Sequence, residues 1–324
     1  MGYLLSAKEL LKYRYPSVVH AIQRARQVLN QLGTKNNSEP IPYWSIFLTY
    51  ACTTDCLYCT QNYSFKNGRM DSPLKGTLPP ESWLLLNDLP NRPEGIVITG
   101  GEPFLYKRLA DVITGLSGFR QIQVVTNLTL DPLEVIEKVR SVTTRRVLFD
   151  CSYHDRAIDF KIFLSRVNLI KEAGLLGSVR IVDVNPAKTR KYIRNFSLKG
   201  IKVQSLFQVG MKGDEVLATS NPEASNLYRK PPVFCRTKLV LFAPNGDVYN
   251  CHTKLYWGDT ASSFGNITTG FSIPDDYCIC HDYGFCHPCQ IGYINIIERD
   301  NHTPAEKSCH VLFSNPPSGV VESR

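Results

Sequence analysis

The sequence predicts an α/β protein, a partial (β/α)6 barrel of the TIM type followed by a small cysteine-rich domain. Two patterns predict this fold class. Between residues 44 and 209, short segments rich in Val, Ile and Leu alternate with helical segments, which is typical of repeated βαβ units with a parallel sheet. From Cys235 to Cys309 the helical pattern fades, and turn residues and seven cysteines replace it.

The predicted strands have apolar cores, as expected of strands that are covered on one or both faces. They span residues 45–51, 95–100, 121–127, 146–152, 178–185 and 202–209, and helices are predicted between them at residues 79–89, 109–117, 132–141 and 159–175. The pattern alone leaves a doubly wound sheet open as the alternative. In both architectures, ligands bind at the carboxyl ends of the strands.

These patterns divide the chain into consecutive segments. They are an N-terminal helical segment and linker at residues 1–43, the barrel at 44–209, a polar linker at 210–234, the cysteine-rich domain at 235–310 and a tail at 311–324.

Charge and hydropathy exclude several classes of protein. The net charge is +8, but Lys and Arg are scattered without a dense basic run, so nucleic acid is not an indicated partner. No apolar run reaches the roughly 18 residues that a membrane-spanning helix needs, so no membrane association is expected. The N-terminus lacks the apolar core of a secretory signal, which predicts a cytoplasmic protein.

The cysteines point to metal binding. The chain has eleven, and without a secretory signal, clustered cysteines favour metal over disulfides. Cys52, Cys56 and Cys59 follow the first predicted strand, in the stretch CTTDCLYC. Structural zinc sites and four-iron clusters normally take four protein ligands, so three thiolates would leave one iron free to bind something else. A zinc knuckle completed by a distant ligand is the alternative.

This loop resembles the motif of the radical S-adenosylmethionine (SAM) family. The resemblance rests on the C-x3-C-x2-C spacing with Tyr58 before the third cysteine. It implies a [4Fe–4S] cluster whose open iron binds the amino and carboxylate groups of SAM. It further implies that an electron from an external flavodoxin- or ferredoxin-type donor cleaves SAM to a 5′-deoxyadenosyl radical, which abstracts a hydrogen atom from the substrate.

The second predicted strand ends in a turn formed by Gly100, Gly101, Glu102 and Pro103. This turn resembles the family's segment that contacts the SAM amino group. Two glycines would let a ligand approach the backbone closely, and a carboxylate can accept a hydrogen bond from an ammonium group. An ordinary strand-to-helix turn with proline at the helix start is the alternative.

Polar residues also end three later strands, namely Asn127, Ser152 and Asn185. The resemblance implies that they reach the ribose and carboxylate of SAM. Asn and Ser also favour caps and turns, which is the alternative for each of them. The resemblance covers about residues 44–209.

Cys151 stands apart from the other cysteines, between Asp150 and Ser152 at the end of the fourth predicted strand. Alternation along a regular strand turns Cys151 and Ser152 to opposite faces. We therefore expect Cys151 to be a small buried apolar residue. The alternative is a catalytic role, as a hydrogen-atom donor to a substrate radical, as in radical epimerases.

Cys235 and Cys251 flank a predicted hairpin, in which Asn-Gly at Gly246 is a strong turn signal. Their C-x10-G-x4-C spacing resembles the entry to the auxiliary-cluster domain of the SPASM and Twitch subgroups of the family. The resemblance implies at least one auxiliary [4Fe–4S] cluster. A zinc ribbon is the alternative, because cysteine pairs also suit zinc.

Two ligand sets are open for this region. A single cluster would use Cys235, Cys251, Cys286 and Cys289, with Cys280 as a substitute, whereas a two-cluster arrangement would add Cys278, Cys280 and Cys309. The middle run C-x-C-x5-C-x2-C is shorter than the SPASM signature at two places, which favours the single cluster. His252, His281 and His287 lie beside these cysteines, as residues more often near a metal's ligands than among them.

The resemblance implies two classes of substrate. The first is a ribosomally made peptide that is crosslinked, epimerised, oxidised or spliced, and the second is a small molecule of the sugar or aminoglycoside type. The 43 residues before the barrel are too few for a leader-binding domain. A peptide enzyme would then need a separate recognition protein, and we favour this peptide class. A non-catalytic metal-binding scaffold is the alternative from another class of protein.

Overall fold

The computed structural model describes residues 43–56, 59, 76–142, 144–183, 186–207, 211–212, 215–216, 233–258, 260–273, 278–280 and 294–298. The chain forms two compact units, Met1–Glu39 and Pro40–Arg324, and the described residues belong to the second. The helix predicted within residues 1–43, most of the 210–234 linker and the 311–324 tail lie outside the described residues. None of the described helices is long and apolar enough to cross a membrane.

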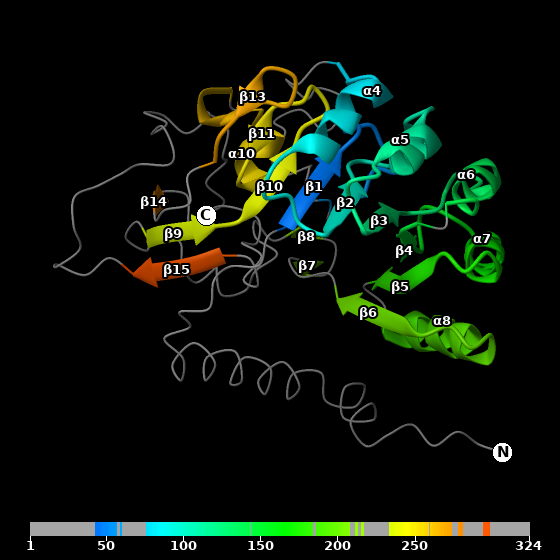
Figure 1. Cartoon of the computed structure of the whole chain (residues 1–324). Helices are drawn as coiled ribbons and strands as arrows, with labels where there is room; N and C mark the ends of the chain where they lie inside the picture. The colour runs from blue at the N-terminus through cyan, green and yellow to red at the C-terminus, as the bar shows by residue number, and fades with distance from the viewer. Residues whose placement is uncertain are drawn as a thin grey trace. The chain divides into compact units, whose positions relative to one another are not determined.

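An eight-stranded sheet organises the second unit, in the order β11-β10-β1-β2-β3-β4-β5-β6 (Figure 1). The six predicted barrel strands all form, as β1 Tyr43–Phe47, β2 Gly95–Thr99, β3 Gln121–Thr126, β4 Arg146–His154, β5 Leu176–Asp183 and β6 Val203–Phe207. Each pairs with its successor in parallel. The prediction of a parallel sheet from repeated βαβ units is confirmed.

The strand order decides against the doubly wound alternative. A doubly wound sheet reverses its strand order at a switch point, whereas β1 to β6 follow one another in chain order. Helices α5, α6, α7 and α8 lie along one side of these strands (Figure 1). The arrangement is consistent with a partial TIM-type barrel, and among the described strands its edges are β11 and β6.

The predicted helices form with small shifts of their ends. The segment predicted at 79–89 forms an α-helix followed by a 3-10 helix, and the helices are α4 Pro80–Trp83, η2 Leu84–Asp88, η3 Pro103–Leu105, α5 Leu109–Gly115, α6 Leu133–Val139 and α7 Phe160–Glu172. The sequence does not predict α8, Pro186–Leu198, because basic residues interrupt its apolar stripe. In the structure its Phe196 is fully buried in the main core.

Two faces of the sheet carry different side chains, because residues alternate along a strand. The outer face meets α5–α8 and holds the main core, in which Ile98 and Phe149 are fully buried. Burying a side chain of this size contributes about 1.5–3 kcal/mol. The opposite face, called the inner face below, is covered near β1, β10 and β11 by α10, His252–Trp257, whose Leu255 packs in one cluster with Phe47.

The predicted hairpin is confirmed, and it joins the main sheet. Strand β10, Leu239–Phe242, pairs in parallel with β1 and antiparallel with β11, Val248–Tyr249. The amide of Gly246, whose φ is 88°, donates to the Ala243 carbonyl at 2.8 Å. The hairpin lies inside the predicted 235–310 domain, yet its first strand extends the sheet beyond β1.

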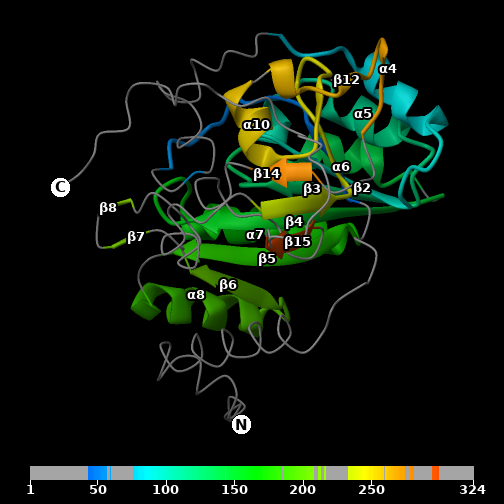
Figure 2. The same ribbon diagram turned by 90° about the vertical axis from the view of Figure 1, so that its left-hand side faces the viewer.

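The remaining described elements are short. A three-stranded sheet joins β14 Cys278–Cys280, β9 Val233–Thr237 and β15 Ile294–Glu298, with β9 in the middle. Figure 2 shows β14 and β9 side by side, as their pairing requires. The others are β7 Met211–Lys212, β8 Glu215–Val216, η4 Thr260–Ser262, β12 Gly265–Asn266 and β13 Gly270–Phe271.

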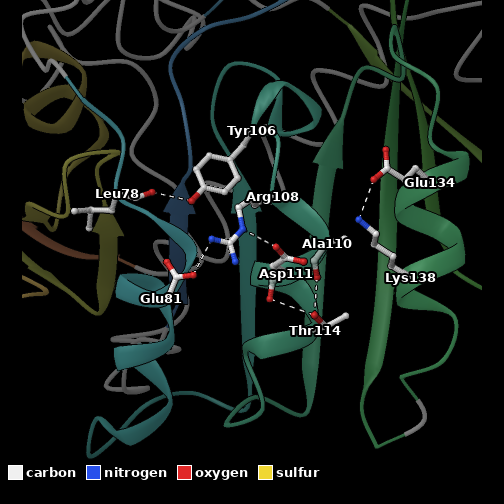
Figure 3. Close-up of polar contacts among 9 residues, drawn as sticks. All are labelled: Leu78, Glu81, Tyr106, Arg108, Ala110, Asp111, Thr114, Glu134 and Lys138. Atoms are coloured by element: carbon white, nitrogen blue, oxygen red, sulfur yellow. Dashed lines mark hydrogen bonds and ion pairs between the residues drawn. The ribbon is translucent and has the colours of Figure 1, made fainter.

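Figure 3 shows polar contacts on and beside helices α4, α5 and α6. Arg108 pairs with Glu81 at 2.8 Å and with Asp111 at 2.7 Å, and all three side chains are largely exposed. The Tyr106 hydroxyl donates to the Leu78 carbonyl at 2.7 Å, which fastens the chain just before α4. Exposed ion pairs contribute little to stability, so most of the folding stability comes from the burial of apolar side chains.

Candidate functional site

The cysteine loop leaves the carboxyl end of β1 and packs directly on the turn after β2. The amide of Gly101 donates to the Thr49 carbonyl at 2.8 Å, and the amide of Glu102 donates to the Ala51 carbonyl at 2.8 Å. The two motifs that the sequence singled out are therefore neighbours, one residue from Cys52. This follows from the parallel pairing of β1 with β2, which brings their carboxyl ends together.

The two glycines have a packing reason that the sequence did not reveal. A Cβ on Gly100 would lie 2.2 Å from the Thr49 carbonyl oxygen, and one on Gly101 would lie 2.0 Å from that of Ala51. Gly100 also has a φ of 142°, a conformation that side chains disfavour. The sequence suggested room for a ligand, whereas in the structure the glycines make room for the backbone that leads into the cysteine loop.

Glu102 is buried, with 1% of its surface exposed, and its carboxylate binds the chain's own donors. It accepts hydrogen bonds from the Phe104 amide at 3.1 Å, the Thr126 hydroxyl at 2.7 Å and the Asn127 amide at 2.8 Å. Burial raises the pKa of this carboxyl, while these hydrogen bonds act to lower it. Glu102 thus ties the end of β2 to the end of β3, and its contact with an ammonium group stays a prediction. Pro103, the next residue, opens η3 and is buried.

Replacing Glu102 with glutamine should destabilise the fold by about 1–3 kcal/mol, because one amide group would then face backbone or hydroxyl donors. Glu102→Ala should cost at least as much, since it leaves these buried donors unpaired. Urea unfolding followed by circular dichroism measures both. Glu134→Gln is the matched control, because the Glu134 side chain is 79% exposed. Equal stability of Glu102→Gln and Glu134→Gln would show that the buried carboxylate is dispensable.

Asn127, at the end of β3, faces the cysteine loop, and its contact with SAM stays a prediction. Its Nδ2 lies 3.2 Å from the Thr53 hydroxyl and 3.6 Å from the Cys52 sulfur. Its Oδ1 accepts from the Thr129 amide at 2.9 Å. Leu128 follows with a φ of 52°, an unusual backbone for a leucine. The end of β3 therefore contacts Cys52 through the side chain of Asn127.

Thr54 and His154 complete the surroundings of the cysteines. The Thr54 hydroxyl lies 3.4 Å from the sulfurs of both Cys52 and Cys56. Nδ1 of His154, at the end of β4, lies 3.8 Å from the Cys56 sulfur. The Cys59 amide donates to the Cys56 carbonyl at 2.9 Å. The sequence assigned Thr54 and His154 no role, although Thr54 sits inside the motif and His154 in a quoted strand end.

The donor set fits an iron–sulfur cluster in its chemistry. The three thiols of the loop are half-buried, and thiolates are the ligands that such clusters take. Polar groups next to the sulfurs suit a cluster, whose thiolates are commonly hydrogen-bonded. Within the part of the chain that the structure describes, no three His, Cys, Asp or Glu side chains are gathered closely enough to hold a metal ion as they stand.

Cys151 and Ser152 lie on opposite faces, as the alternation predicts. Cys151 is fully buried in the core of the outer face, and burial raises the pKa of its thiol far above the usual range. This location suits an apolar residue and not a hydrogen donor to a substrate on the inner face. Ser152 is half-buried and pairs in register with Arg180 of β5. Tyr58 and Asn185 lie outside the described residues.

Among the later cysteines, Cys235 of β9 stands opposite Cys278 of β14, and Cys280 stands opposite Val233. Cys251 is half-buried at the start of α10. Its neighbour His252 is half-buried and packs edge-on against the ring of Phe47, and desolvation lowers the His252 pKa to about 4. The other predicted ligands and flanking histidines lie outside the described residues, namely Cys286, Cys289, Cys309, His281 and His287.

Comparisons with known proteins give matches among solved structures only. No family model matches the chain, and no curated protein matches it. Native anSMEcpe with bound AdoMet and Kp18Cys peptide is similar with a TM-score of 0.49 and 15% identity, over 71% of this chain and 79% of that one.

Two structures of SuiB from Streptococcus suis are similar as well. The one bound to S-adenosylmethionine has a TM-score of 0.39 and 13% identity, over 79% of this chain and 72% of that one. The one bound to precursor peptide SuiA has a TM-score of 0.34 and 13% identity, over 74% and 65%. These are similarities of chain trace, and they assign no activity to this chain.

Proposed function

We propose that this chain is a radical SAM enzyme. In this proposal Cys52, Cys56 and Cys59 hold a [4Fe–4S] cluster that has one iron open to SAM. The observation that carries the proposal is a loop with three half-buried thiols at the carboxyl end of β1, contacted by the strand-end residues Asn127 and His154. When bound, the cluster supplies the electron that converts SAM to the 5′-deoxyadenosyl radical.

The chain's own residues hold the sulfurs in place. Asn127 donates toward the Cys52 sulfur, and the Thr54 hydroxyl lies between Cys52 and Cys56. Donors beside a ligating sulfur tune its charge and orient it. The contact of Gly101 and Glu102 with the loop fixes where it leaves the sheet, and such positioning is what radical chemistry asks of a protein.

We propose a peptide as the substrate, with hydrogen abstraction leading to crosslinking, epimerisation, oxidation or splicing, and with a separate protein for peptide recognition. We also propose an auxiliary cluster on Cys235, Cys251, Cys286 and Cys289, with Cys280 as a substitute ligand. An acidic electron donor of the flavodoxin or ferredoxin type would reduce the first cluster in the cytoplasm, where free thiols persist.

Anaerobic reconstitution tests the activity. The full chain is loaded with iron and sulfide, reduced with dithionite and incubated with SAM, and 5′-deoxyadenosine is measured by chromatography. We expect its formation to depend on both reductant and SAM. A protein that carries an intact and reducible cluster yet forms no 5′-deoxyadenosine would sink the proposal. A protein that retains zinc and no iron would support the metal-binding scaffold instead.

A further inference from the structure

A polar cluster interrupts the inner face of the sheet along β3, β4 and β5. It consists of Gln123, Asp150, Ser178 and Arg180, and it is called the inner-face cluster. Asp150 lies at its centre and accepts hydrogen bonds from Ser178 at 2.8 Å, from Arg180 at 3.0 Å and from Gln123. No residue of the proposed iron site belongs to it.

The two charged side chains of this cluster differ in how many of their hydrogen-bonding groups have partners. The Asp150 side chain is only 3% exposed, and neighbouring strands supply it with donors, as a buried carboxylate requires. The Arg180 side chain is 31% exposed and uses one terminal nitrogen on Asp150. Among the described residues it has no other hydrogen bond or ion pair. Most donors of its guanidinium fork therefore remain open.

Arg180 lies on the inner face of the sheet, below the strand ends where the proposed reaction site lies. Arg180 lies on β5 three positions before its last residue, Asp183, and is in register with Ser152 on the inner face of β4. The carboxyl end of β4 carries His154, which contacts the cysteine loop. A ligand that reaches down from the strand ends along the inner face would meet the guanidinium.

Guanidinium geometry selects the chemistry of that ligand. The planar fork of arginine matches a carboxylate through two parallel hydrogen bonds. Asp150 fixes one side of the fork, so little side-chain freedom is lost when a second carboxylate binds the other side. Because Asp150 and Arg180 together are neutral, the added carboxylate also meets no net repulsion from the pair.

We propose that Arg180, held by Asp150, binds a carboxylate of the substrate and so places the reacting C–H bond. The ligand class is a carboxylate-bearing molecule, which for a peptide means an acidic side chain or the C-terminal group. This inference rests on the proposed function for the identity of the substrate. The binding itself requires neither a cluster nor turnover.

Arginine-selective labelling tests the binding. The full chain is treated with phenylglyoxal in the presence of N-acetylglutamate or of its amide analogue N-acetylglutamine, and the labelling rate of each arginine is measured by mass spectrometry. We expect N-acetylglutamate to slow labelling of Arg180 at least threefold and N-acetylglutamine to leave it unchanged. Arg120, the residue just before β3, is the internal control, because its side chain is 83% exposed.

A second arm decides whose carboxylate binds. SAM or its decarboxylated analogue is added, in place of the glutamate derivative, to the chain reconstituted with iron and sulfide, because the proposed SAM site includes the cluster. If SAM protects Arg180 while the decarboxylated analogue does not, the carboxylate is that of the cofactor and the assignment to substrate is overturned. If neither protects it while N-acetylglutamate does, the assignment is supported.

A variant separates binding from a purely structural role. Asp150→Asn/Arg180→Gln replaces both charges together, so no buried charge is left alone, and circular dichroism checks its fold. N-acetylglutamate should raise the melting temperature of the wild type and of Arg120→Gln but not that of the double variant. An equal rise in all three would overturn the proposal. The absence of 5′-deoxyadenosine would contradict the proposed function without touching this result.

Discussion

Replacing Cys52, Cys56 and Cys59 together by alanine should abolish the formation of 5′-deoxyadenosine. It should also lower the iron content by about four atoms per chain, since one cluster loses every protein ligand. Iron bound elsewhere would remain, so the difference between wild type and variant counts this cluster alone. The measurement is an iron assay and chromatography of the nucleoside after anaerobic reconstitution of both proteins.

The matched control for this prediction is Cys151→Ala. It removes a thiol that lies in the core and leaves the loop intact, so iron content and 5′-deoxyadenosine should stay at wild-type levels. A role of Cys151 as hydrogen donor would change the product and not the cleavage of SAM. If the triple variant kept both its iron and its SAM cleavage, the loop would not be the site of the reaction.

Gly101→Ala should be the most disruptive single substitution at the site. Its Cβ would fall 2.0 Å from the Ala51 carbonyl oxygen, a distance that no relaxed structure tolerates, so the two backbones must separate. This breaks the hydrogen bonds that dock the turn on the start of the cysteine loop. We expect a loss of about 3 kcal/mol or more in the free energy of unfolding, and a loss of bound iron.

Gly95→Ala, at the start of β2, is the control. Its Cβ would lie 3.6 Å from the nearest atom, the Gln121 carbonyl oxygen, which is an ordinary contact. Urea unfolding and iron content of both variants are compared with the wild type. If Gly101→Ala unfolds at the same urea concentration as Gly95→Ala, the close packing of the two motifs does not stabilise the site.

The sequence is most informative where structure is local. Apolar periodicity predicts β1 to β6 with their order and direction, and the Asn-Gly signal predicts the hairpin at Gly246. It also predicts that the cysteine loop and the turn after β2 share one edge of the sheet. Each of these depends on the type and spacing of residues that are near one another in the chain.

The sequence is least informative where distant segments meet. Nothing local indicates that β10 pairs with β1, or that Asp150 and Arg180 form an ion pair across β4 and β5. The need for glycine at positions 100 and 101 likewise arises from a backbone that is distant in the chain. Helix α8 was missed for a different reason, since its many basic residues mask the few apolar ones that it buries.

The pairing of β10 with β1 also determines when the sheet can be completed during synthesis of the chain. Strand β1 leaves the ribosome before the rest of the sheet, but its second neighbour is made only when the chain has reached Phe242. Until then β1 has an unpaired edge, and such edges invite wrong partners. The cysteine loop continues directly from this strand, so it reaches its final shape only after β10 has been made. Iron delivery would then act on a chain that already extends past Phe242.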